Sequence, residues 1–364
     1  MILFYYRKLL LANVKNGEQN MFSIDKDAII NSLDNLFKPS VLVIGDMAID
    51  EMVYGTTDRM SREAPVLILR HYDTKIILGA ASNAAHNIAT LNNGKVSVIG
   101  TYGDDYYAPV LLNSFKEAGV NTQYMVKDSS RATTVKTRIS GSCLQSVTQQ
   151  IVRIDRETKE PLSKEIEDKI IEQTELAIPK HDAVILSDYH ISLLTPRVIS
   201  KTIELCKKYN KIIVVDSQKD LDRFQGVTSM TPNQPDSEKF VGFYINNEET
   251  LKKAGEVMLA KTDAESALIT LGGNGMALFE KNGNFVKIPV FNKKDVFDVT
   301  GAGDTVVATY TLAMAAGFSK KDAAILGNLA ASIVIRYFGC ATTTIDILKD
   351  TLKEMDFNTV KVNA

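Results

Sequence analysis

The sequence predicts an α/β protein in which a doubly wound, mostly parallel sheet carries helices on both faces and a small β-sheet stands apart as a lid. From residue 163 onward, short apolar runs alternate regularly with longer helical stretches. Such alternation is typical of parallel sheets built from strand–helix–strand units. By contrast, residues 53–78 and 131–155 contain strand-like runs without intervening helices. These two regions together predict the lid, which we expect to be antiparallel.

The first part of the chain predicts a helix and then a buried strand. Residues 22–38 have an amphipathic pattern that stops at Pro39. Residues 40–45 form a continuous apolar run closed by glycine, as expected for a strand buried on both faces. Asp46 and Asp50 follow, at the end of the strand where open α/β sheets gather ligands. At Asp46, a role in forming a turn explains the aspartate as well as ligand binding does. Asp50 is therefore the better ligand candidate.

The next stretch contains the predicted lid strands and another strand–helix pair. Gly79-Ala-Ala-Ser-Asn83 opens a helical run that continues to Leu91, and residues 96–100 are a second buried strand. The expected lid strands lie on either side of this unit. They cover residues 66–72, 74–78, 133–139 and 150–154.

The second half of the chain supplies the rest of the main sheet. We find no linker, repeat or low-complexity segment in it, so one domain plus a lid is the economical interpretation of 364 residues. The expected helices cover 164–178, 196–209 and 248–260, the strands cover 183–188, 211–216 and 267–270, and a hairpin pairs 276–279 with 285–289.

A turn with two glycines directly precedes a long apolar helical run. Residues 306–316 are rich in Ala, Leu and Met and predict a helix. Gly301 and Gly303 leave bare N–H groups at its N-terminus, where unpaired donors and the helix dipole favour anions. Asp304 would repel such an anion, so its presence needs a chemical reason. The best one is a general base that takes a proton from a hydroxyl attacking a bound phosphate. The competing interpretation is that Asp304 only caps the helix.

The composition excludes several classes of function. The chain carries 42 basic and 44 acidic residues, and its net charge of −2 gives no sign of a nucleic-acid-binding surface. No apolar run approaches a membrane span. Arg7 and Lys8 interrupt the mildly apolar N-terminus, so we expect no signal peptide. A reducing cytoplasm is the natural setting for three widely spaced cysteines in no metal-binding pattern, which are Cys143, Cys206 and Cys340.

The glycine turn also belongs to a recognisable motif. Asp298-Val-Thr-Gly-Ala-Gly-Asp304 resembles the C-terminal signature of the ribokinase (PfkB) superfamily of sugar kinases. Within that superfamily, the chain is most similar to the D-glycero-β-D-manno-heptose-7-phosphate kinases, which often form the N-terminal half of a bifunctional ADP-heptose synthase. The likeness covers roughly residues 40–350 and includes Arg59-Met-Ser-Arg-Glu-Ala-Pro-Val66, Gln149-Gln-Ile-Val-Arg-Ile-Asp155, Leu186-Ser-Asp-Tyr189 and Thr231-Pro-Asn233.

This resemblance implies a ribokinase-like enzyme that uses ATP and Mg²⁺. The subfamily phosphorylates the anomeric C1 hydroxyl of heptose 7-phosphate to the 1,7-bisphosphate, on the way to lipopolysaccharide heptose. The nucleotidyltransferase half of the bifunctional proteins needs a His-x-Gly-His signature, which is missing here, so we expect a stand-alone kinase. The implied kinase domain covers residues 39–355, with an N-terminal extension (1–38, where Met21 is an alternative start) and a tail (356–364).

The resemblance also implies a role for individual residues. Asp304 would be the base, and the amides of Gly301, Ala302 and Gly303 would form an anion hole for the transferred phosphoryl group. Sugar hydroxyls would contact Asp50, Gly79 and Asn83. The nucleotide would contact Asn233, Thr270, Gly272, Gly275 and, near adenine, Asn328, while Asp236 would organise Mg²⁺ through water.

Two cations on one predicted lid strand are candidates for binding the phosphate that the substrate already carries. Lys136 and Arg138 alternate along the strand, so both face the same side and could reach one phosphate. Without the family resemblance, a solvated strand face would be the better interpretation of this pair.

The chain departs from the family pattern mainly on the sugar side. A paired glycine becomes Gly79-Ala80, and an Asp-Tyr-x-Lys-Gly segment becomes Asp188-Tyr-His-Ile-Ser192, which loses a lysine. The metal-organising Asn-x-x-Glu becomes Asn233-Gln-Pro-Asp236, and Asp-Pro-Lys-Gly becomes Asp216-Ser-Gln-Lys219. A different sugar or sugar phosphate, or a catalytically impaired sugar-binding relative, therefore stays an alternative. A dinucleotide-binding dehydrogenase is disfavoured, because no Gly-x-Gly-x-x-Gly follows the first strand.

The lid also predicts an assembly. A sheet of two or three strands cannot bury both of its faces, and small isolated sheets are marginally stable in water. Many kinases of this superfamily pair their lids across a two-fold axis. We therefore expect a homodimer whose interface includes residues 64–78 and 133–154.

Overall fold

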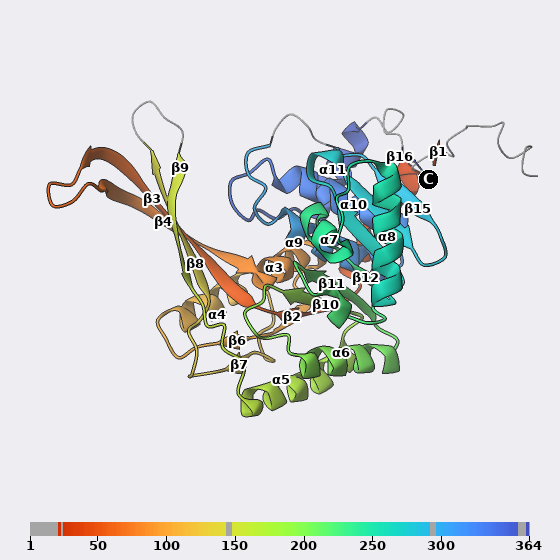
Figure 1. The fold of residues 1–364 in the computed structure, drawn as a ribbon, viewed down its shortest axis with the longest axis horizontal. Helices are drawn as coiled ribbons and strands as arrows, with labels where there is room; N and C mark the ends of the chain where they lie inside the picture. The colour runs from red at the N-terminus through yellow and green to blue at the C-terminus, as the bar shows by residue number, and fades with distance from the viewer. Residues whose placement is uncertain (1–20, 23–24, 143–147, 292–295, 356–361, 364) are drawn as a thin grey trace, which may run out of the picture.

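The computed structural model describes residues 21–22, 25–142, 148–291, 296–355 and 362–363. Residues 1–20, Cys143 and most of the predicted tail lie outside the described residues. The described chain forms a ten-stranded sheet with helices on both faces and a four-stranded lid that projects from one side (Figure 1).

The main sheet confirms the doubly wound prediction. Its strand order is β1-β16-β15-β14-β13-β12-β11-β10-β2-β5, with parallel pairing from β13 to β5 and antiparallel pairing from β14 to β1. The strands are β1 (Met21–Phe22), β2 (Val41–Gly45), β5 (Val96–Ile99), β10 (Ala183–Asp188), β11 (Ile212–Ser217), β12 (Ser229–Met230), β13 (Ser266–Thr270), β14 (Met276–Glu280), β15 (Phe285–Ile288) and β16 (Val362–Asn363). A separate two-stranded pair joins β6 (Thr101–Tyr102) to β7 (Val126–Lys127).

Two hydrophobic cores explain why the central strands are continuous apolar runs. In β2, Val41 and Val43 pack into the core beneath α3, α9 and α10, whereas Leu42 and Ile44 pack into the opposite core with α5, α6 and α8. Successive side chains of a strand point to opposite faces, so a strand that is covered on both sides needs an apolar residue at every position.

The helices were predicted in part. Those expected over 22–38, 84–91, 164–178, 196–209, 248–260 and 306–316 are all present, with shifted ends. The first is split into a short α-helix and a 3₁₀ turn, and four others were not predicted. The α-helices are α2 (Lys26–Ser32), α3 (Ala81–Asn92), α4 (Tyr107–Glu117), α5 (Lys164–Ala177), α6 (Pro196–Lys208), α7 (Gln234–Val241), α8 (Glu248–Thr262), α9 (Ala302–Ala315), α10 (Lys320–Val334) and α11 (Ile345–Glu354), and the 3₁₀ turns are η1 (Leu33–Phe37), η2 (Ile178–Lys180), η3 (Leu221–Arg223) and η4 (Gly272–Asn274).

The lid differs from the prediction in two ways. Its order is β4-β3-β8-β9, and the central pair, β3 with β8, is parallel rather than antiparallel. It also begins earlier than residue 53, because β3 (Met47–Met60) was not predicted and starts almost directly after β2. The other strands are β4 (Leu67–Ala80), which unites the two runs expected over 66–78, β8 (Val135–Ser142) and β9 (Gln149–Arg156).

The N-terminal segment packs on the rest of the domain from α2 onward. Ile29, Leu33 and Leu36 are buried in the core that also holds α11. Residues 26–37 thus pack into the core of the described fold. The boundary between an N-terminal extension and the kinase domain at residue 38 stays a prediction. Among the described residues, none of the helices combines the length and the apolar character needed to cross a bilayer.

Candidate active site

The predicted glycine turn lies at the N-terminus of α9, next to the base of the lid. Gly301 is the N-cap residue of α9, with φ 78°, and no side chain caps this helix end. A Cβ on Gly301 would lie 2.5 Å from the Asn83 side-chain nitrogen, so only glycine fits. A Cβ on Gly303 would meet nothing within 4 Å, so this side of the turn is open. Of the predicted anion-hole amides, that of Ala302 donates to the Val299 carbonyl oxygen (3.2 Å).

Asp304 is buried in the first turn of α9 and is held by two side chains. Its Oδ2 accepts a hydrogen bond from Asn83 Nδ2 (2.8 Å), and its Oδ1 accepts one from the Tyr189 hydroxyl (2.8 Å). Burial raises the pKa of Asp304 to about 6, against the opposing effect of these two hydrogen bonds. The capping interpretation is not supported, because the carboxylate bonds to side chains from other elements rather than to the N-terminal amides of its own helix.

Asn83 belongs to a polar chain inside the protein. Its side chain was expected to contact sugar hydroxyls, but here it donates to Asp304. Asn87 Nδ2 donates to Asn83 Oδ1 (3.1 Å), and the Thr305 hydroxyl donates to Asn87 Oδ1 (3.0 Å). Two consecutive residues of α9 are thus connected through α3, which fixes the orientation of the Asp304 carboxylate.

Asp50 and Arg138 form an ion pair at the base of the lid. Arg138 Nη1 lies 2.7 Å from Asp50 Oδ1, and both side chains are largely buried. The Cys340 thiol contacts Asp50 Oδ2 at 3.6 Å. A Cβ on Gly79 would lie 2.7 Å from the Asp50 carboxyl carbon, so this glycine provides the space that the carboxylate fills. Arg138 was predicted to bind a phosphate. In the structure its guanidinium pairs with the Asp50 carboxylate, which would compete with a phosphate for it.

Lys136 lies on the same face of β8 as Arg138, as expected from their alternation. Its ammonium is 4.7 Å from the centre of the Tyr189 ring, a distance typical of a cation–π contact. The positive charge of Lys136 also lowers the pKa of Asp304. Of the two lid cations, Lys136 therefore lies near Asp304 and Arg138 pairs with Asp50.

A cavity of about 230 Å³ opens between the lid and the glycine turn. Lid residues form one wall, and the segments on either side of α9 and α10 form the other. Its lining includes Asp50, Arg138, Ser140, Gln150, Asp298, Thr300 and Cys340. This mixture of hydroxyl, amide and carboxylate groups with one cation suits a polyhydroxylated ligand.

Several residues predicted to bind the nucleotide lie close to one another, around the end of β13 and the segment after β15. Asn233 caps α7 and accepts a hydrogen bond from the Asp236 amide (2.8 Å), and Asn233 forms a bridge with Thr270. Gly275 has φ 88°, and a Cβ there would lie 2.0 Å from the Ile288 carbonyl oxygen. Asn328 donates to the Pro289 carbonyl oxygen (2.7 Å).

These contacts give several of the nucleotide candidates a structural role as well. Gly272 also has a positive φ of 54°, in the 3₁₀ turn after β13. A hollow of about 320 Å³ borders this region and is lined by Gln234, Asn246, Asn247, Gly273, Asn274, Lys287 and Pro289, among others.

Several carboxylates lie close together near the end of β11. Burial raises the pKa of Asp216 to about 7, and the charges of Asp304, Asp236 and Asp188 add to this rise. Within the described ranges, no group of three His, Cys, Asp or Glu side chains could hold a metal ion by itself. Mg²⁺ usually binds through one or two carboxylates, waters and substrate phosphates. Asp236 and Asp216 therefore fit a magnesium ion that arrives with the nucleotide.

Two of the departures from the family pattern keep a backbone conformation suited to glycine. Ala80 has φ 50° and Ser192 has φ 78°. Both stand where the family pattern has glycine, so the chain retains the turn geometry at a conformational cost. Asp46, by contrast, has a structural role. Its carboxylate accepts the backbone N–H groups of Tyr189 (2.9 Å), Ile191 (3.1 Å) and Leu193 (3.2 Å).

Replacing Ala80 with glycine should therefore stabilise the protein. A non-glycine residue in such a region costs about 1–3 kcal/mol, and the added flexibility of glycine offsets about 0.5–1 kcal/mol of this gain. We expect Ala80→Gly to raise the free energy of unfolding by about 1 kcal/mol in urea denaturation. Ala84→Gly, inside α3, is the matched control and should lower it. Equal destabilisation of both variants would contradict the assigned strain.

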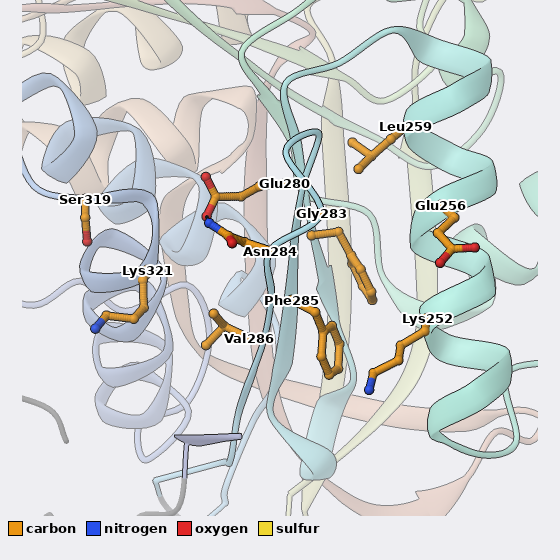
Figure 2. A pocket seen from close by; sticks show the side chains of 11 residues that line it. Lys252, Glu256, Leu259, Glu280, Gly283, Asn284, Phe285, Val286, Ser319 and Lys321 are labelled. Atoms are coloured by element: carbon orange, nitrogen blue, oxygen red, sulfur yellow. Dashed lines mark hydrogen bonds between the residues drawn. The ribbon is translucent and has the colours of Figure 1, made fainter. Parts of the chain in front are cut away.

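A larger hollow lies away from this site. It measures about 750 Å³ and lies between α8, the β14–β15 hairpin and α10 (Figure 2). Lys252 and Lys321 line it together with Glu256 and Glu280, so its charges are balanced. None of the predicted site residues lines this hollow.

The fold and the site together define a class of enzyme. A buried carboxylate beside a helix N-terminus, at the carboxyl edge of a doubly wound sheet and beneath a β-lid, is suited to moving a phosphoryl group to a hydroxyl. Solved structures with the same fold include phosphofructokinase-2 from Escherichia coli in complex with substrates and products (TM-score 0.71, 16% identity, 86% of this chain and 98% of that chain). Arabidopsis thaliana ribokinase complexed with ribose and ATP is another (TM-score 0.68, 17% identity, 87% and 99%).

The sequence comparisons identify the family. The model of the pfkB family carbohydrate kinases matches residues 38–347. The chain is 38% identical to the bifunctional protein HldE of Nitratiruptor sp. over 86% of its own length and 65% of that protein. It is 39% identical to HldE of Desulfatibacillum aliphaticivorans over 86% of its own length and 63% of that protein. The chain thus spans just under two thirds of these relatives. It belongs to the pfkB family of carbohydrate kinases.

The sequence analysis assigned no role to three neighbours of Asp304. Tyr189 and Asp216 stood inside quoted motifs, and Cys340 was noted only as a thiol. Tyr189 directly follows a buried strand that ends in Asp188, which was the one available signal. The approach of Cys340 to Asp50 depends on the path of the chain after α10 and has no local signature.

Proposed function

We propose that this kinase phosphorylates the anomeric C1 hydroxyl of D-glycero-β-D-manno-heptose 7-phosphate with ATP, giving the 1,7-bisphosphate. The observation that carries the proposal is the buried Asp304 carboxylate, which is held by two side chains at an uncapped helix N-terminus. The chain resembles the heptose-7-phosphate kinases over roughly residues 40–350, and the relatives described above are HldE proteins.

The chemistry needs one proton transfer and one phosphoryl transfer. The sugar hydroxyl gives its proton to Asp304 as its oxygen attacks the γ-phosphorus, and ADP leaves. Charge that develops on the transferred group is met by the N-terminus of α9, where Gly303 leaves the approach open. Asp236 and Asp216 would hold Mg²⁺, which neutralises phosphate charge when bound. A base with a pKa of about 6 is mostly ionised at neutral pH.

A different sugar or sugar phosphate is the second candidate acceptor. The family lysine of the Asp-Tyr-x-Lys-Gly segment corresponds to Ile191, which is buried here, with 6% of its surface exposed. The site therefore has one cation fewer on its sugar side than the family pattern. A catalytically impaired sugar-binding relative is less well supported, because such a protein has no use for a base beside an anion site.

A panel assay tests the acceptor. ADP release should be measured with ATP and Mg²⁺ against heptose 7-phosphate, other sugar phosphates and their unphosphorylated sugars. We expect the highest kcat/KM with heptose 7-phosphate and a marked loss with the free heptose. A preference for an unphosphorylated sugar would refute a phosphosugar acceptor. If no compound in the panel caused ADP release, the kinase activity itself would be refuted.

We also propose a homodimer that forms through the lid, in the cytoplasm. Several large apolar lid side chains are exposed in the single chain, whereas Leu78 is buried within its own subunit. The exposed ones are Met60, Val66, Leu67, Ile76, Ile151, Val152 and Ile154. A partner lid would cover apolar surface of these side chains. Burial of apolar surface stabilises an interface by about 25 cal/mol per Å².

Light scattering at micromolar concentration should give a mass of about 80 kDa, twice the 40.1 kDa of the chain. Ile151→Glu should shift the protein toward monomer by placing a charge in the interface. Leu176→Glu, at a similarly exposed leucine on α5, is the matched control and should leave the mass unchanged. A fully active wild-type monomer at this concentration would sink the dimer proposal.

A further inference from the structure

Tyr189 makes the closest contact between the candidate base and the loop after β10. Its hydroxyl donates to Asp304 Oδ1 at 2.8 Å, while Asn83 occupies Oδ2. Burial and the neighbouring Asp304 charge raise the pKa of Tyr189 well above its usual range, so the phenol stays a protonated donor. A hydroxyl that donates to a carboxylate favours the ionised form of that carboxylate.

The backbone around Tyr189 is fixed by a buried carboxylate. Asp46 accepts the N–H groups of Tyr189, Ile191 and Leu193, at 2.9, 3.1 and 3.2 Å. Asp46 lies between β2 and β3, where the chain passes from the main sheet into the lid. The position of the tyrosine is therefore tied to the base of the lid.

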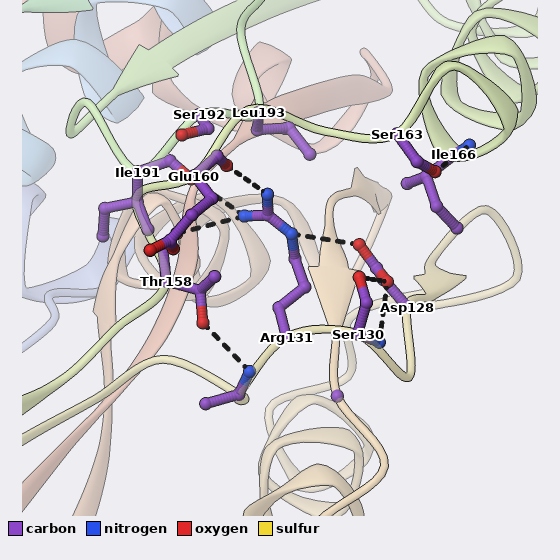
Figure 3. A network of polar contacts seen from close by, with 12 residues as sticks. Asp128, Ser130, Arg131, Thr158, Glu160, Ser163, Ile166, Ile191, Ser192 and Leu193 are labelled. Atoms are coloured by element: carbon purple, nitrogen blue, oxygen red, sulfur yellow. Dashed lines mark hydrogen bonds and ion pairs between the residues drawn. The ribbon is translucent and has the colours of Figure 1, made fainter.

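A second network of polar contacts includes Ile191 of the same loop (Figure 3). Arg131 pairs with Asp128 at 3.0 Å, and both side chains are buried. The guanidinium also donates to the carbonyl oxygens of Thr158 (3.1 Å) and Ile191 (3.5 Å). Arg131 precedes β8, and Thr158 follows β9, so this network joins both ends of the β8–β9 hairpin to the loop that carries Tyr189.

The lid also reaches Tyr189 directly. Lys136 of β8 places its ammonium 4.7 Å from the centre of the ring. Tyr189 thus contacts the base with its hydroxyl and a lid cation with its face. Because both its backbone and its ring are held in place, Tyr189 can orient a carboxylate better than a mobile tyrosine could.

We propose that Tyr189 is a positioning residue of the phosphotransfer site, whose hydroxyl orients Asp304 and favours its ionised form while Lys136 connects it to the lid. The inference rests on the proposed role of Asp304 as base. During transfer the substrate proton goes to Asp304, and Tyr189 keeps its own proton throughout. The charged or titratable groups that face Asp304 are Asp50 on β3, Lys136 on β8, Asp216 on β11, Tyr189 after β10 and Cys340 after α10.

Tyr189→Phe is the test, because it removes the hydroxyl and keeps the ring that Lys136 contacts. The pKa of Asp304 can be read without any substrate, from carboxyl-carbon NMR of protein labelled with ¹³C-aspartate, with Asp304→Asn used to assign the signal. We expect the pKa to rise from about 6 by about one unit. Tyr107→Phe is the matched control, since Tyr107 also donates to a carboxylate, that of Glu51 (3.2 Å), and its loss should leave the Asp304 signal in place.

The kinetic readout should move in the same direction. A higher pKa leaves the base protonated over a wider acidic range, so the acid limb of kcat/KM for the sugar phosphate should move up. Activity should fall about tenfold below pH 6 and little above pH 8. An unshifted Asp304 signal in Tyr189→Phe, or an equal shift in Tyr107→Phe, would overturn the inference. Absence of sugar kinase activity in the wild type would refute the proposed function, whereas the NMR titration still decides the role of Tyr189.

Discussion

Asp304→Asn is expected to lower turnover by about 10²–10⁴, the usual contribution of a positioned acid–base group, and to change nucleotide binding little. Asparagine has the same shape, and its amide oxygen can still accept from Tyr189 or Asn83, so the turn should keep its structure. The amide cannot take the proton of the attacking hydroxyl. The loss should therefore appear in kcat, measured by ADP release at saturating substrates, and not in the Kd for ATP.

The matched control for this variant is Asp182→Asn, the same chemical change at a carboxylate that binds Ser40 at the amino ends of β2 and β10. It should retain wild-type turnover. If Asp304→Asn turned over at the wild-type rate, the base would have to be a different residue. A large loss of ATP affinity would instead assign Asp304 to the nucleotide site.

Lys136→Ala and Arg138→Ala are expected to raise KM for the sugar phosphate by about ten- to a hundredfold, with little change in KM for ATP. A charge-assisted contact contributes roughly 1.5–3 kcal/mol, and each cation is proposed to hold the existing phosphate of the substrate. The two variants should differ in their effect on stability. Arg138→Ala also leaves the buried Asp50 carboxylate without its partner, so it should lower the melting temperature more than Lys136→Ala.

Steady-state kinetics with each substrate varied in turn measure this effect. Arg153→Ala is the control on the adjacent lid strand, because Arg153 is half-exposed and pairs with Asp155 of its own strand. It should change neither KM. Equal increases in KM for both substrates in Lys136→Ala would mean that this residue serves the fold or the nucleotide instead.

The main sheet was predictable because each central strand is covered on both faces. β2, β10 and β13 were predicted to within one residue or so, as continuous apolar runs must be buried. β3 was missed for the opposite reason. It includes Asp50, Glu51 and Gly55, and its outer half lies in a lid with little core to bury, so no periodic apolar pattern marks it. α7 was missed because it is short and buries few side chains.

The candidate site was predictable where a residue conflicts with its local surroundings. A carboxylate beside two glycines at a helix N-terminus is such a conflict, and it led to Asp304 from the sequence alone. The partners of Asp304 carry no such signal. Tyr189 reaches Asp304 from the loop after β10 and Asn83 reaches it from α3, so their hydrogen bonds depend on tertiary packing. The Asp50–Arg138 pair likewise depends on the register between β3 and β8, which sequence periodicity does not set.

The most direct test of the phosphotransfer proposal is ³¹P NMR of wild-type enzyme incubated with ATP, Mg²⁺ and heptose 7-phosphate. We predict a new anomeric phosphate signal that grows as ADP forms, in equal amount, while the 7-phosphate signal remains. The same incubation with Asp304→Asn should show almost none over the same period. ADP formation without a sugar 1-phosphate, or a new phosphate at another carbon, would contradict the proposed reaction.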